Sequence, residues 1–393
     1  MDLTPILLYV RDLDLKEFSL EARFELAKGD TFMSKLFLPV DNIPKDKFYY
    51  PIFFNKTELL DNLNSISLDY AVQHSVHQKN CKIIIISRYE GWTWDRYHTL
   101  IEFLKDQYGF TNDSFVVLSN NAIGSNTYNS IFFNFWEYFS YSDNPLKEKH
   151  LGKSAVFNNV DRQYRFICLN RRCHAHRFAI TAQLYNHRDQ SLLSFAKAGH
   201  AVYDQFPTFR YFNDQKKMFN QYYQKSSMIW EKLKLDDKVP LTLATSLDPY
   251  DHENLETNPI LDEYTEKFYQ SYLHIVVETT MSNIFYSEKT FKPIKYFQPF
   301  ILIGAKGSLL QLRNLGYKTF ENYIDESYDE ISNNEDRLIQ AVNAGLNFVG
   351  QTNLSSILQE MYPILEHNHN ILNERSRSTR GKLHQDISSM LLI

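Results

Sequence analysis

The sequence predicts an α/β protein with two Rossmann-like lobes that face each other across a cleft, followed by C-terminal helices. The chain has 393 residues, and domain-size scaling suggests about two domains of ~150 to 200 residues each. Strand-length apolar runs alternate with helical patterns in the first third of the chain and again in its second half. Such alternation is typical of doubly wound parallel sheets.

The first lobe is predicted from three apolar runs of strand length. They are ILLYV (6–10), KIIIIS (82–87) and FVVLS (115–119), and continuous runs of this kind indicate parallel strands buried on both faces. Between the last two runs, apolar side chains recur at helical spacing and stop at Gly109; they are Tyr97, Leu100, Ile101, Leu104 and Tyr108. These segments predict a strand–helix–strand unit.

A connection between the lobes is expected at about residues 140–160. There the chain loses its periodicity and gains Pro, Gly, Asn and Lys. We therefore assign residues 1–150 to the first lobe and residues 151–393 to the second. The second assignment includes one or two helices from Leu354 to about Arg375 and a basic, polar tail, NERSRSTRGK.

The second lobe is predicted to repeat the alternation of strands and helices. Its strands are expected in YRFICLN, LHIVVE and PFILIG. Helices are expected to begin at Ser287, in SEKTFKPIKYF, and at Ser308, in SLLQLRNLGY, with each serine as the N-cap. Pro293 lies far enough into the first of these helices to kink it.

Composition and charge limit the possible functions. With 42 basic and 47 acidic residues the formal net charge is -5, so any site for a polyanion has to be a local patch. Cys81, Cys168 and Cys173 match neither a disulfide framework nor a zinc pattern, which favours free thiols in a reducing compartment. No apolar run has the ~18 to 20 residues of a membrane span, and no signal peptide is visible. We therefore expect a cytoplasmic protein.

Two acids and a lysine lie where ligands bind in open α/β sheets, at the carboxyl ends of the strands. Glu278 ends a predicted strand, and Glu288 and Lys289 stand in the first turn of the next helix. A helix N-terminus and a lysine suit a phosphate group, and a carboxylate can accept hydrogen bonds from sugar hydroxyls. Alternatively, Ser287 and Glu288 only cap the helix and Glu278 forms a salt bridge.

A second candidate is LNRRCHAHR (169–177), where another predicted strand leads into a helix. Arg171, Arg172 and Arg177 are grouped there with His174 and His176. Guanidinium groups bind phosphate oxygens in pairs, so this cluster favours an anion site. The alternative is a solvated basic face with structural histidines.

The first lobe offers weaker candidates. SRYEGWTWDRYH (87–98) contains Glu90, Trp92, Trp94 and Asp95, and carboxylates beside indole rings suit a sugar or base acceptor. The alternative is that the tryptophans pack on the sheet edge and Asp95 caps the helix. The DLD triplet at 12–14 is similar to the metal-binding triplet of many sugar transferases, but we favour a surface loop and expect no metal site.

The segments FICLNRRCHAHR and VVETTMSNIFYSEKTFKPIKYFQPFILIGAKGSLLQLRNLGYKTFENYIDESYDE together resemble glycosyltransferase-like proteins of bacteria, phages and large viruses. More distantly they are similar to the donor-binding lobe of the α1,3-fucosyltransferases. The resemblance covers roughly residues 164–330, and it implies a GT-B fold with the acceptor in the first lobe and the nucleotide-sugar in the second. It also implies an inverting mechanism that needs no metal-binding triplet.

The resemblance implies roles for individual residues. The donor would be bound by Arg171 or Arg177, with Asn170 beside them, and by Glu278, Glu288 and Lys289. The first lobe matches no family motif; we expect the base that takes the acceptor proton to be Glu90, with Asp95 as the second choice. No cofactor is expected beyond the nucleoside-diphosphate sugar.

Several functions stay open at this point. The leading one is a glycosyltransferase with a saccharide acceptor, acting in the cytoplasm of a bacterium or an infected host cell. A variant transfers sugar to hydroxymethylated bases of phage DNA, and basic runs at 147–188 and 375–382 favour it. A non-catalytic module that binds a nucleotide or saccharide is the third, since a fold does not guarantee turnover.

Overall fold

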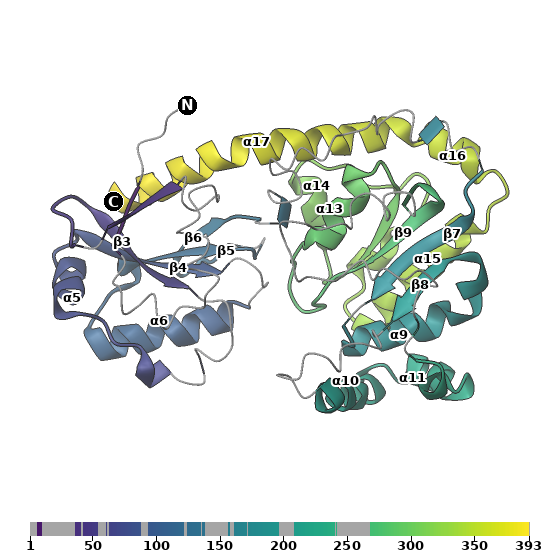
Figure 1. Cartoon of the computed structure of the whole chain (residues 1–393), viewed down its shortest axis with the longest axis horizontal. Coiled ribbons are helices and arrows are strands. Elements are labelled where there is room, and N and C mark those ends of the chain that lie inside the picture. The colour runs from purple at the N-terminus through teal and green to yellow at the C-terminus, as the bar shows by residue number, and fades with distance from the viewer. Residues whose placement is uncertain are drawn as a thin grey trace. The chain divides into compact units, whose positions relative to one another are not determined.

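The computed structural model divides the chain into two compact units (Figure 1). Unit 1 contains Met1–Phe139 and Glu374–Ile393, and unit 2 contains Ser140–Asn373. The predicted boundary between residues 150 and 151 lies outside the described residues. The structure describes residues 6–9, 36–40, 42–53, 60, 63–87, 93–121, 124–134, 136–137, 156–157, 161–170, 172–195, 208–239, 241 and 268–392.

Unit 1 contains a six-stranded parallel sheet in the order β2-β1-β3-β4-β5-β6. Since β1 pairs with both β2 and β3, the winding direction reverses between β1 and β3. The strands are β1 (Ile6–Tyr9), β2 (Phe37–Val40), β3 (Phe48–Phe53), β4 (Cys81–Ser87), β5 (Phe115–Ser119) and β6 (Asn129–Phe132).

The two faces of this sheet have separate apolar cores, because successive side chains of a strand point to opposite faces. Ile83 and Ile85 pack with the buried faces of α5 (Tyr70–His77) and α6 (Trp94–Tyr108). Ile84 and Ile86 belong to the second core. The predicted helix is therefore confirmed as α6, and it ends at Gly109 in the left-handed conformation, with φ of 70°.

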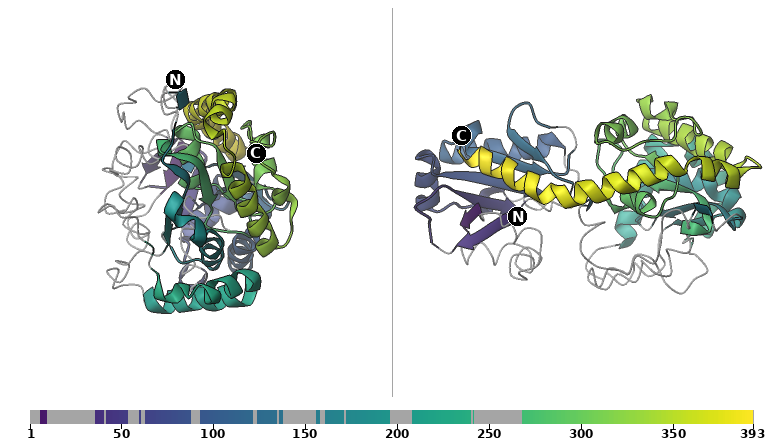
Figure 2. Two further views of the ribbon diagram at one scale, coloured as in Figure 1. Left: turned by 90° about the vertical axis from the view of Figure 1, so that its right-hand side faces the viewer. Right: turned by 90° about the horizontal axis from the view of Figure 1, so that it is seen from above.

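The second core of unit 1 is completed by the end of the chain. Leu383, Ile387 and Leu391 of α17 (Tyr362–Leu392) are buried against this face, and the backbone oxygen of Ile387 accepts a hydrogen bond from the Tyr49 hydroxyl over 2.8 Å. Figure 2 shows the last turns of α17 along the unit 1 strands. The prediction that NERSRSTRGK is a polar tail of the second lobe was wrong, because the segment lies within α17 and Glu374–Ile393 belong to unit 1. Apolar residues spaced by four after this segment bury the end of the helix.

Unit 2 contains a four-stranded parallel sheet in the order β10-β9-β7-β8. Its strands are β7 (Tyr164–Asn170), β8 (Leu192–Phe195), β9 (Ser271–Val277) and β10 (Phe300–Ile303). Its helices are α9 (Ala175–Leu184), α10 (Thr208–Tyr222), α11 (Gln224–Lys232), α13 (Glu288–Lys295), α14 (Ser308–Asn314), α15 (Asn334–Val349), α16 (Leu354–Glu360) and the first part of α17.

Both units confirm the predicted α/β class with parallel sheets. Ser287 is confirmed as the N-cap of α13, since its side chain accepts a hydrogen bond from the Lys289 N–H. Pro293 lies inside α13, which ends two residues later. The prediction of Ser308 as an N-cap was wrong: Gly307 occupies that position, and Asp329 supplies the capping carboxylate.

Candidate functional site

The candidate site lies where the winding of the unit 2 sheet reverses. β7 pairs with β8 on one side and with β9 on the other, so the chain turns in opposite directions after β7 and after β9. Open α/β sheets bind ligands at the carboxyl ends of the two strands that flank such a point. We call residues 170, 172–177, 278 and 287–292 the switch-point edge.

Glu278 follows β9 and is 1% exposed. Its Oε1 accepts hydrogen bonds from the Ser287 N–H over 2.9 Å and from the Thr290 hydroxyl over 2.6 Å. Its Oε2 accepts from the Ser287 hydroxyl over 2.7 Å. Three of the roughly four acceptor positions of a carboxylate are thus used within the fold. Glu278 fixes the start of α13 to the end of β9, and this leaves it little capacity for ligand hydroxyls.

Lys289 and Glu288 form an ion pair at the start of α13. Lys289 Nζ donates to Glu288 Oε1 over 2.9 Å and to Ser287 Oγ over 3.1 Å. An ammonium group has three N–H donors, so one remains for a ligand. Burial raises the pKa of Glu288, but the charges of Lys289 and Lys292 outweigh burial and lower it to about 2. Glu288 is therefore an anion at neutral pH.

His176 joins α9 to the end of β9. Its Nε2 lies 2.9 Å from the backbone oxygen of Glu278, and because a carbonyl only accepts hydrogen bonds, Nε2 carries the proton. Burial, and then the charge of Arg177, lower the pKa of His176 to about 3. The ring is neutral at physiological pH and holds two strand ends together through α9.

Arg177 lies in the first turn of α9 and is 3% exposed. Its Nη2 donates to the backbone oxygen of Val277 over 3.4 Å, and its Nη1 donates to that of Arg172 over 3.3 Å. The guanidinium group therefore lies against the residue before Glu278. Two segments that are about a hundred residues apart in sequence meet at this point.

The charge at the switch-point edge is predominantly positive. The rings of His174 and His176 are stacked, with centroids 5.6 Å apart. The pKa of His174 is lowered by burial and then by Arg177, His176, Arg172 and Lys289, so cations from both segments act on this ring. An edge with Arg172, Arg177 and Lys289 favours an anionic ligand.

Asn170 ends β7 and is fully buried. Its Nδ2 donates to the Cys168 sulfur over 3.2 Å. Its Oδ1 has no hydrogen-bond partner in the described part of the chain. Asn170 is therefore a buried acceptor beside the cations of the same strand end.

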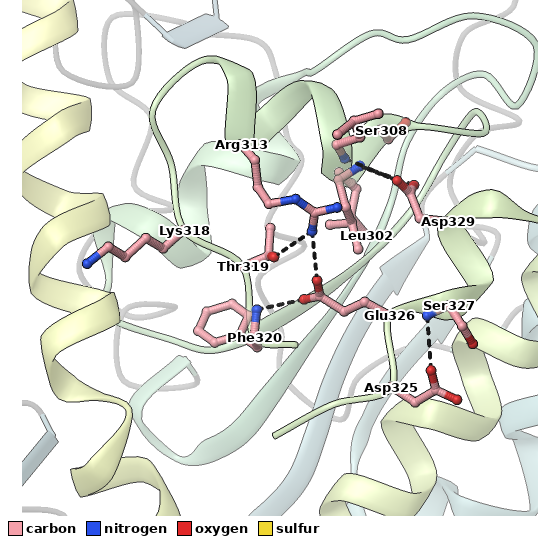
Figure 3. Close-up of polar contacts among 12 residues, drawn as sticks. Leu302, Ser308, Arg313, Lys318, Thr319, Phe320, Asp325, Glu326, Ser327 and Asp329 are labelled. Carbon is pink, nitrogen blue, oxygen red and sulfur yellow. Dashed lines mark hydrogen bonds and ion pairs between the residues drawn. The ribbon is translucent and has the colours of Figure 1, made fainter. Parts of the chain in front are cut away.

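The Gly-rich turn after β10 does not offer a second anion site. Gly307 has a φ of +79° and donates its N–H to the backbone oxygen of Asp329. The Asp329 carboxylate then accepts from the N–H groups of Leu309 and Leu310, at the start of α14 (Figure 3). The positive end of this helix is already occupied by an internal carboxylate.

The same segment contains a second internal carboxylate (Figure 3). Glu326 accepts from Arg313 Nη1 over 3.0 Å and from the Phe320 N–H over 2.6 Å, while Arg313 also donates to Thr319. Sequence reasoning missed the capping role of Asp329 and the internal contacts of Glu326. The acids of DESYDE (325–330), which follow the Gly-rich turn at 304–307 and the helix after it, were the available signal.

Of the remaining predicted base and donor-binding residues, only Asp95 lies in the described part of the chain. Glu90, Trp92 and Arg171 lie outside the described residues, as does the DLD triplet. Asp95 is exposed in the first turn of α6 in unit 1. Its backbone oxygen accepts a hydrogen bond from the Thr99 hydroxyl over 2.9 Å, and no side-chain cap forms at that helix start.

No family model, curated protein or solved structure matches this chain. Among the described residues, no helix is long and apolar enough to cross a membrane. The same residues contain no cluster of three His, Cys, Asp or Glu side chains that could hold a metal ion.

Proposed function

We propose that the protein is a glycosyltransferase of GT-B type that binds a nucleoside-diphosphate sugar at the switch-point edge of unit 2. The observation that carries this proposal is that Arg177 contacts the end of β9, and that Glu278 joins the helix start with Lys289 to the same strand end, where the winding reverses. Two positive groups from different segments suit the two phosphates of such a donor. Unit 1 is then the lobe that binds the acceptor.

The proposed chemistry is an inverting transfer. The acceptor oxygen attacks the anomeric carbon while the bond from that carbon to the diphosphate oxygen breaks, and the acceptor proton passes to a carboxylate. The departing diphosphate gains negative charge, which Arg177 and the remaining N–H of Lys289 stabilise. Glu278 and Ser287 act through Lys289, because they fix the turn that carries it.

The titratable side chains of the switch-point edge do not suit the role of general base, so we assign the base to unit 1. At the switch-point edge His174 and His176 have lowered pKa values, Glu278 already accepts three internal hydrogen bonds, and Glu288 is paired with Lys289. A general base needs a pKa near the working pH and access to the acceptor proton. We therefore keep Glu90, and then Asp95, as the proposed bases.

Thermal shifts with UDP-, GDP-, CMP- and dTDP-sugars, with and without EDTA, test the donor site. A ligand at a hundred times its Kd adds about 2.7 kcal/mol of stability. We expect one nucleoside-diphosphate sugar to raise Tm with or without EDTA, and Arg177→Ala and Lys289→Ala to abolish the shift. Lys318→Ala serves as the control, since Lys318 is exposed and its side chain points away from the Arg313 network in Figure 3.

Product analysis then separates transfer from simple binding. We expect the selected sugar to appear on a saccharide acceptor or, in the DNA-modifying variant, on hydroxymethylated DNA. A donor that binds but is transferred to neither acceptor nor water would identify a non-catalytic module. The absence of a shift with every nucleotide-sugar would remove the donor site altogether.

A further inference from the structure

We infer that Asn170 is a specificity residue that accepts a hydrogen bond from a sugar hydroxyl of the ligand, next to the anion-binding cations. This inference rests on the proposed function, because it assigns a group of the same ligand. Its starting point is the buried amide oxygen of Asn170, which has no partner among the described residues.

An unpartnered buried acceptor requires an explanation. The large majority of buried side-chain polar atoms in native proteins are hydrogen-bonded, since burying one without a partner costs stability. The other half of the Asn170 amide is fixed, because Nδ2 donates to Cys168 Sγ two residues earlier on the same strand face. Burial raises the pKa of the Cys168 thiol to about 12, so the sulfur is an uncharged, weak acceptor.

The position of Asn170 indicates which kind of partner is missing. Asn170 ends β7, one of the two strands that flank the reversal of winding, and Arg177 lies seven residues further along the chain at the start of α9. Phosphate oxygens accept hydrogen bonds, so they pair with Arg177 and Lys289 but not with an amide oxygen. A hydroxyl group donates. The ligand therefore carries a hydroxyl close to its phosphates, as in the ribose or the transferred sugar of a nucleotide-sugar.

The test replaces Asn170 with leucine, which has nearly the same shape and no polar atom. Binding is measured calorimetrically with inorganic pyrophosphate, with the nucleoside diphosphate selected by the donor panel, and with its sugar conjugate. We expect Asn170→Leu to weaken nucleotide binding about three- to tenfold, the value of one hydrogen bond, and to leave pyrophosphate binding within about twofold of wild type. Equal losses with and without the sugar conjugate assign the hydroxyl to ribose, and a loss with the conjugate alone assigns it to the transferred sugar.

The stability of the ligand-free protein gives a second readout. A residue kept for a ligand costs stability, so Asn170→Leu should unfold at the same temperature as wild type or higher. The matched control is Asn368→Leu. Asn368 is also buried, but it donates to the Lys318 carbonyl over 2.8 Å and accepts from the Lys318 N–H over 2.7 Å. That variant should lose stability and bind nucleotide normally.

Three results would overturn the inference. Unchanged nucleotide affinity in a destabilised Asn170→Leu protein would make Asn170 a structural residue. An equal loss of pyrophosphate affinity would show that the amide N–H, not the oxygen, faces the ligand. If the wild-type protein binds pyrophosphate but no nucleotide, the ligand carries no hydroxyl for Asn170 and only the anion site remains. If it binds neither pyrophosphate nor a nucleotide, the proposed function itself is wrong.

Discussion

Arg375 and Glu137 form a two-point ion pair in unit 1. The Nε and Nη2 atoms of Arg375 donate to the two carboxylate oxygens of Glu137, over 2.5 Å and 3.1 Å. Glu137 is 3% exposed, and the Ser376 hydroxyl also donates to its backbone oxygen over 3.1 Å. The pair lies in the turns of α17 that precede the apolar contacts of Leu383 and Ile387. It therefore anchors the end of the chain to unit 1 by polar contacts as well.

Arg375→Ala is expected to destabilise unit 1. The substitution leaves the Glu137 carboxylate buried without its cation. Breaking a buried pair costs about 3 to 5 kcal/mol, and the lower end is expected because the Arg375 side chain is 30% exposed. Urea denaturation followed by circular dichroism measures the loss. Lys382→Ala, which removes an exposed cation from the same helix, should change stability by less than about 0.5 kcal/mol. Equal effects of the two substitutions would mean that the pair contributes no more than surface charge.

Sequence periodicity was sufficient to predict α6 and the strands β1, β4, β5, β7, β9 and β10, but it did not predict β2, β3, β6 or β8. The runs KIIIIS and FVVLS contain enough β-branched residues to fix their class, and Gly109 fixes the helix end. The end of the chain was mispredicted for the opposite reason. Arg375, Arg377 and Lys382 dominate the local composition, while the apolar positions of α17 gain their meaning only from a sheet more than 250 residues earlier.

The candidate site was predictable in outline but not in its internal contacts. The rule that ligands bind at strand ends placed Asn170, Arg177 and Lys289 at one edge. The roles of Glu278 and His176 depended on distances that no spacing reveals. Glu278 meets Ser287, nine positions later, because the loop between them returns to the strand end, and His176 meets the Glu278 carbonyl across 102 positions of sequence.

His176 is expected to make the stability of unit 2 depend on pH. The unfolded chain has a histidine pKa of about 6.5 and therefore binds a proton below that pH, while the folded pKa of His176 is about 3. The contribution of His176 to the free energy of unfolding is fully present above pH 6.5. It decreases as the pH falls toward 3, by up to about 1.4 kcal/mol per pH unit for one such histidine. His174 and His274 also have lowered pKa values and act in the same direction.

His176→Gln separates the hydrogen bond from the titration. The glutamine amide can still donate to the Glu278 carbonyl, but it cannot take up a proton. Between pH 7 and pH 5 the variant should lose stability less steeply than wild type, as followed by thermal denaturation. Parallel pH profiles would show that the ring is protonated in the folded protein.

Glu288 is expected to make folding stability depend on pH as well, but at a lower pH than His176. Its pKa falls from the ordinary value of 4.5 to about 2 on folding, because Lys289 and Lys292 outweigh its burial. The stabilisation it provides is present above pH 4.5 and decreases as the pH falls through this window toward 2. Glu288→Gln should flatten the stability profile between pH 4.5 and pH 3 relative to wild type. The comparison is made by urea denaturation, and Glu360→Gln on α16 provides the control for an acid outside the site.

The proposed base can be tested without disturbing the donor site. Glu90→Gln should lower kcat about 10²- to 10⁴-fold, the usual contribution of a general base, and Asp95→Asn should do so if Asp95 is the base instead. Neither substitution should alter the affinity for the nucleotide-sugar, since both residues belong to unit 1 and the cations belong to unit 2. Asp106→Asn, at an exposed position of α6, should retain full activity. If both carboxylate variants transfer sugar at the wild-type rate, the base is another residue; if both lose donor affinity, the division of roles between the two units is wrong.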